Sequence, residues 1–120
     1  MPEPLVDPAV LDRLARDIGR KAAQEFAERY RTAVVERLAA LRTAVAERHL
    51  DRAHNLLINI DGASRMLGAR RLALAAGRLA DRLREDHAPT PEDLSELSRL
   101  VSLTDAELAR VLDGREGGSS

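Results

Sequence analysis

Cysteine and tryptophan are absent from this sequence of 120 residues, which holds a single phenylalanine, Phe26, and a single tyrosine, Tyr30. Without cysteine the chain can form no disulfide, no thiolate nucleophile and no cysteine-ligated metal site. No stretch approaches the ~20 apolar residues needed to span a bilayer, and the opening residues lack the basic and apolar regions of a secretory signal. We therefore expect a cytoplasmic protein that makes no membrane contact.

An excess of charge of one sign is also missing, because 19 basic residues face 20 acidic ones and leave a formal net charge of -1. Net positive charge and interleaved aromatic residues are typical of nucleic-acid-binding proteins, so this composition argues against a nucleic-acid partner. With 44% hydrophobic and 32% charged residues, the chain has the composition of a folded globular protein. Its length suits one domain, which we expect over residues 1–113, followed by a flexible polar tail, 114–120.

Apolar residues recur at helical spacing along most of the chain, and no segment shows the period-two alternation of a strand. Asp7 and Pro8 begin a short helix that Gly19 ends. Four longer helices follow. The predicted helices cover residues 8–18, 20–48, 49–67, 72–85 and 91–112. Their short connections favour an all-α, antiparallel four-helix bundle with one short additional helix at the N-terminus.

The last predicted helix carries two start signals. Thr90 and Pro91 provide an N-cap and a first-turn proline. Thr104 and Glu107 then stand at the spacing of a capping box, in which two side chains satisfy the free backbone groups of a new helix start. We therefore predict that this helix breaks near Leu103 and resumes as far as Leu112.

The segment from Ile58 to Leu72 reads INIDGASRMLGARRL. It resembles the signature of the histidine-phosphotransfer (HPt) family, H-x-L-K-G-(small)-(small)-x-x-L-G-A-x-x-L, without a gap. The matching residues are Gly62, Ala63, Ser64, Leu67, Gly68, Ala69 and Leu72. Flanking segments resemble the family at the expected distances, so the likeness extends to about residue 86. Ile58 and Asp61 depart from it, because they replace the family's phosphorylated histidine and its lysine.

These two departures bear on the chemistry that the resemblance implies. Transfer of a phosphoryl group requires a nucleophilic imidazole nitrogen, which Ile58 lacks. The family's lysine is expected to help neutralise the phosphoryl group, whereas Asp61 would repel it. The chain therefore resembles a pseudo-HPt module, which binds a response-regulator receiver domain or a histidine kinase without carrying phosphate. It would be neither an enzyme nor a cofactor-binding protein.

Helical spacing places five candidate partner-binding residues on one face of the third predicted helix. They are His54, Ile58, Asp61, Gly62 and Arg65. Glycine inside a helix costs roughly 1 kcal/mol relative to alanine, so Gly62 requires a reason. It could let a partner approach closely, or it could admit a neighbouring helix of the bundle; the family spacing favours the partner.

Other readings of the sequence stay open. His54, one turn before Ile58, could be a displaced phosphoacceptor, in which case the chain would be an active phosphotransfer protein. An apolar face near Ile58 could instead form a homodimer, although no heptad seam supports one and we expect a monomer. His49 and His87 form no cluster with Asp or Glu at ligand spacing, so no metal site is predicted.

Charge is distributed unevenly between two later segments. Six arginines and one acid, Asp81, lie between Arg65 and Arg84, whereas the segment from Glu92 to Asp113 holds six acids and two arginines. For most of these residues we expect two solvated faces that pair with each other. Arg65, and with it Arg70, could instead attract the acidic pocket of a receiver domain.

Overall fold

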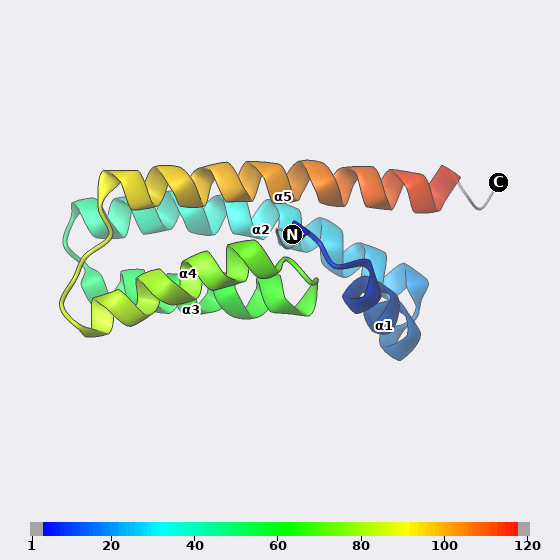
Figure 1. The fold of residues 1–120 in the computed structure, drawn as a ribbon, viewed down its shortest axis with the longest axis horizontal. Helices are drawn as coiled ribbons and strands as arrows, with labels where there is room; N and C mark the ends of the chain where they lie inside the picture. The colour runs from blue at the N-terminus through cyan, green and yellow to red at the C-terminus, as the bar shows by residue number, and fades with distance from the viewer. Residues whose placement is uncertain (1–3, 118–120) are drawn as a thin grey trace.

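The structure, a computed structural model, describes residues 4–117, with side chains described from 4 to 113. Its helices are α1 (Pro8–Ile18), α2 (Arg20–Ala46), α3 (Leu50–Met66), α4 (Arg70–Arg84) and α5 (Pro91–Gly117). The four longer helices run up and down as a bundle, and α1 packs against α2 (Figure 1). Since the described residues contain no strand, the predicted all-α bundle with a short additional helix is confirmed.

The bundle consists of two long helices and two short ones. α2 and α5 have 27 residues each, whereas α3 and α4 have 17 and 15. In Figure 1 the α3–α4 hairpin lies beside one half of the α2–α5 pair, and α1 lies beside the other half of α2. A face formed by α3 and α4 therefore belongs to one half of the molecule.

Local capping explains where α1 and α5 begin. The Asp7 carboxylate accepts a hydrogen bond of 3.0 Å from the backbone N–H of Ala9. At the start of α5, the backbone N–H of Thr90 donates to Asp93 at 2.9 Å, and the Asp93 N–H donates to the Thr90 hydroxyl at 3.1 Å. The hydrogen bond from the Thr90 N–H is the main cause that lowers the pKa of Asp93. Both predicted helix starts are confirmed.

The predicted break near Leu103 is wrong, because α5 continues without interruption. Thr104 is buried, and its hydroxyl has no hydrogen-bond partner, while Glu107 pairs with Arg110 and caps nothing. The buried face continues through Leu97, Leu100, Val101, Thr104, Leu108 and Leu112. A break here would expose backbone groups within a buried seam, so the seam overrides the local capping signal. The predicted polar tail begins inside α5, and residues 118–120 lie outside the described residues.

A polar contact inside the bundle fixes how α3 is rotated against α2. The hydroxyl groups of Tyr30 on α2 and Ser64 on α3 lie 2.7 Å apart, and both residues are buried. Burial raises the pKa of Tyr30 to about 12, against a smaller lowering by the Ser64 hydrogen bond. Because Ser64 faces inward, the residues on the opposite side of α3 face solvent.

Replacing Tyr30 with phenylalanine is expected to lower the free energy of unfolding by about 1–3 kcal/mol, because the buried Ser64 hydroxyl would lose its partner. Ser64→Ala should cost a similar amount by leaving the Tyr30 hydroxyl unpaired. Urea unfolding of both variants and of the double variant measures the coupling between them. The double variant should cost clearly less than the sum of the single ones, and simple additivity would contradict this role.

Candidate functional site

α3 has one face in the core and one at the surface. The core face consists of Ala53, Leu57, Ile60 and Ser64. This spacing turns Ile58 and Arg65 outward and leaves Gly62 at the surface. His54 and Asp61 are partly buried at the edge of that surface. The five candidate residues thus lie on one side of the helix, as the spacing predicted, and their binding role remains a prediction.

Gly62 lies next to open space. Apart from the nearby backbone of α3 itself, no atom of the described residues lies within 4 Å of the position that a Cβ on Gly62 would occupy. The alternative in which Gly62 admits a neighbouring helix is therefore wrong. Gly62 therefore leaves the surface of α3 without a side chain at this point.

A shallow depression of about 240 Å³ lies between α3 and α4. Ile58, Asp61 and Arg65 line it from α3. The lining residues from α4 are Leu74, Gly77, Arg78 and Asp81. The structure thus brings three of the five candidate residues together, whereas His54 and Gly62 are not part of this lining.

Two exposed apolar side chains lie at this depression. The large apolar side chains exposed among the described residues are Ile18, Val35, Ile58, Met66 and Leu74. Ile58 and Leu74 line the same depression, at 42% and 46% exposed, and Met66 lies two turns after Ile58 on α3. Gly62 stands midway between Ile58 and Met66 in the sequence, so the outer face of α3 offers two apolar groups with a gap between them.

Asp61 and Arg65 form an ion pair along α3. Nε of Arg65 donates to Oδ1 of Asp61 at 2.6 Å, and this hydrogen bond is the main cause that raises the pKa of Arg65. On the other side of the carboxylate, Oδ2 lies 3.1 Å from the position that a Cβ on Gly77 would occupy. Asp61 is therefore directed toward α4.

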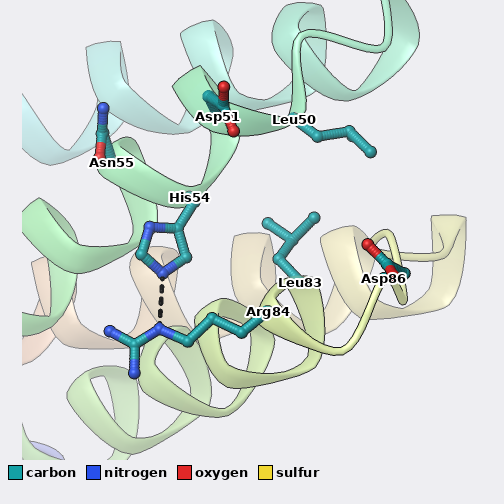
Figure 2. A pocket seen from close by; sticks show the side chains of 7 residues that line it. All are labelled: Leu50, Asp51, His54, Asn55, Leu83, Arg84 and Asp86. Atoms are coloured by element: carbon teal, nitrogen blue, oxygen red, sulfur yellow. Dashed lines mark hydrogen bonds between the residues drawn. The ribbon is translucent and has the colours of Figure 1, made fainter.

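His54 lines a different pocket, of about 440 Å³, between the start of α3 and the end of α4 (Figure 2). Nε of Arg84 donates a hydrogen bond of 3.2 Å to Nε2 of His54. That bond requires an unprotonated Nε2, and it occupies the lone pair that a nucleophilic attack from this nitrogen would use. His54 and Ile58 thus belong to separate hollows of the surface.

Comparison with protein-family models matches residues 25–113 to the Hpt domain. The chain belongs to the Hpt domain family. No curated protein and no solved structure matches it. Hpt domains take part in two-component phosphotransfer signalling and interact with histidine kinases and response regulators, and they are generally carriers rather than enzymes.

The matched region of this Hpt domain runs from within α2 to within α5 and contains all five candidate residues. Sequence reasoning missed the contribution of α4, namely Leu74, Gly77 and Arg78. Leu74 carried a signal, because it is a large apolar residue two positions after Leu72 and falls outside the buried stripe of its helix. Gly77, a glycine inside a predicted helix, carried the same signal as Gly62. Its position opposite Asp61 and that of Arg78 beside the depression could not be predicted, since spacing within one helix does not give its register against another.

The two oppositely charged segments pair less than expected. Among the described residues one ion pair, Arg82–Asp93, joins them. Arg65 pairs with Asp61 on its own helix, and the exposed Arg70 forms no ion pair with the side chains that the structure describes. Among the described residues, the arginines near the depression therefore form no ion pairs with the acidic segment of α5.

Within the described part of this Hpt domain, no group of three or more histidine, aspartate or glutamate side chains is placed to hold a metal ion. None of the helices described combines the length and the apolar character that crossing a membrane requires.

Proposed function

We propose that this Hpt domain binds a response-regulator receiver domain or a histidine kinase without carrying phosphate, as a regulatory or scaffolding module. Ile58 carries the proposal. It stands where the family signature has the phosphorylated histidine, and its side chain is exposed at the surface of α3. An alkyl group has no nitrogen that could attack or hold a phosphoryl group.

The surface around Ile58 supports binding. Exposed apolar side chains that gather in one place are typical of protein interaction sites. Here Ile58 and Leu74 line the same depression, Met66 is exposed two turns further along α3, and Gly62 leaves space for close approach. Arg65 and Arg78 border the depression and would attract an acidic surface.

In the proposed mechanism, the module acts by occupying a binding surface of its partner. A module that covers the phosphorylation pocket of a receiver, or the kinase surface that recognises it, prevents the productive partner from docking there. The same contact could hold a receiver near its kinase as a scaffold. In either case another protein carries the phosphorylated histidine.

His54 is the residue through which an active phosphotransfer protein would have to work. Its Nε2 accepts a hydrogen bond from Arg84, and it lies in a hollow separate from the Ile58 depression. This geometry favours the phosphate-free function, because a reaction at Nε2 would first have to break the contact with Arg84.

The deciding experiment mixes the purified protein with phosphorylated receiver domains and with histidine kinases from the same cell, and follows both complex formation and transfer of the labelled phosphoryl group. Binding to at least one of them without transfer is the expected result. Transfer that disappears in His54→Gln would replace the proposal with a relocated active site, and absence of all binding would contradict it. Light scattering on the free protein tests the expected monomer against the homodimer.

A further inference from the structure

The two charged residues of the Asp61–Arg65 pair are unequally accessible. The Asp61 side chain is 17% exposed, and that of Arg65 is 64% exposed. Because Nε of Arg65 donates to Oδ1 of Asp61, the guanidinium is tethered one helical turn from the carboxylate. Asp61 therefore offers a partner little surface, and the group presented to solvent is the guanidinium.

The position of the Asp61 carboxylate depends on α4. Of the described neighbours, Oδ2 of Asp61 is the atom that a Cβ on Gly77 would meet first, at 3.1 Å. Gly77 lies inside α4, where glycine costs roughly 1 kcal/mol relative to alanine. The space that it leaves for Asp61 is the structural reason found for this glycine.

We propose that Asp61 is a positioning residue, which holds Arg65 beside the α3–α4 depression, and that Arg65 selects partners with a carboxylate facing that depression. The inference rests on the proposed function and names the chemistry of its partner. The bond to Asp61 uses Nε, and the terminal guanidinium nitrogens form no hydrogen bond within the described residues. The two terminal nitrogens can donate parallel hydrogen bonds to the two oxygens of one carboxylate of the partner.

Asp61→Asn distinguishes the positioning role of Asp61 from a role as a negative charge alone. If Asp61 acted only as a negative charge near the interface, Asp61→Asn would strengthen binding to an acidic surface or leave it unchanged. If Asp61 positions Arg65, the same substitution frees the arginine side chain. Binding then has to restrict the conformations of that side chain, which lowers the affinity. Only the positioning role predicts weaker binding.

The experiment compares Asp61→Asn with Asp81→Asn against the receiver domain or kinase that the wild-type protein binds most tightly. Asp81 is the matched control, since it lines the same depression, is 75% exposed, and pairs at 3.9 Å with Arg84 rather than with Arg65. Asp61→Asn should weaken binding about twofold to tenfold, the cost of ordering one long side chain. Asp81→Asn removes a negative charge from the same depression without touching the Asp61–Arg65 bond, so it should raise the affinity slightly. Equal or tighter binding by Asp61→Asn would overturn the inference.

A second measurement needs no partner. The Nε–H signal of Arg65 in a ¹⁵N–¹H NMR spectrum reports its hydrogen bond to Asp61, and it should move toward the position of unbonded arginines in Asp61→Asn and stay in place in Asp81→Asn. An unmoved signal would refute the positioning role. If the wild-type protein binds no receiver and no kinase, the proposed function fails, while this spectrum still decides whether Asp61 holds Arg65.

Discussion

Gly62→Arg is expected to weaken binding to the receiver domain or kinase by about 100-fold or more, the effect of losing a central interface contact. Apart from the nearby backbone of α3 itself, no described atom lies within 4 Å of the position that a new Cβ would take. The arginine side chain therefore projects from the surface between Ile58 and Met66, where it keeps the partner away from both. Surface plasmon resonance or calorimetry measures the loss.

The fold should tolerate this change, so binding and folding can be separated. Gly62→Ala is the matched control: it should raise the free energy of unfolding by up to about 1 kcal/mol, because alanine favours a helix. Its single methyl group should reduce binding far less than the arginine does. Far-ultraviolet circular dichroism should show unchanged helical content in both variants. An affinity that Gly62→Arg leaves unaltered would rule out docking over this face.

Gly68→Ala is expected to lower the free energy of unfolding by about 2–5 kcal/mol, the sum of left-handed backbone strain and overpacking. Gly68 ends α3 with φ +77, in the region that favours glycine. A Cβ there would lie 2.9 Å from the backbone oxygen of Asp7 and 2.9 Å from Cβ of Val10. One of these contacts involves rigid backbone, so the N-terminal segment would have to shift.

Gly62→Ala is the control for Gly68→Ala. Both variants make the same chemical change on one segment of the chain, but only Gly68 has a positive φ and close neighbours. Urea unfolding should therefore show opposite signs, with Gly62→Ala more stable than the wild type and Gly68→Ala less stable. Similar effects of the two substitutions would show that the contact between Gly68 and α1 adds nothing to stability.

Much of the fold could be predicted from local signals, because helix starts and ends depend on neighbouring residues. Asp7 and Pro8 marked the start of α1, and Gly68 marked the end of α3. The error in α5 has the opposite origin. The spacing of Thr104 and Glu107 is a local signal too, but the buried seam of that helix is formed with other elements and decides the outcome.

For the candidate site, periodicity predicted which residues of α3 share the outer face, and it could not predict what lies beside them. The hydrogen bond from Arg84 to His54 spans 30 residues of sequence, and Gly77 lies 16 residues after Asp61. Such contacts depend on the register of two antiparallel helices, which a single sequence does not specify. The direction of the Asp61 carboxylate was therefore inaccessible to sequence reasoning.

The contact between the N-terminal segment and the end of α3 shows that this segment is part of the folded domain. The backbone N–H of Asp7 donates to the carbonyl of Gly68 at 2.9 Å, and Val6 and Leu11 are buried in the same core as the leucines of α3 and α4. These residues precede the family match, which starts at 25. The family match is thus shorter than the segment that builds the core, and a protein trimmed to residues 25–113 would lose Val6 and Leu11 from that core.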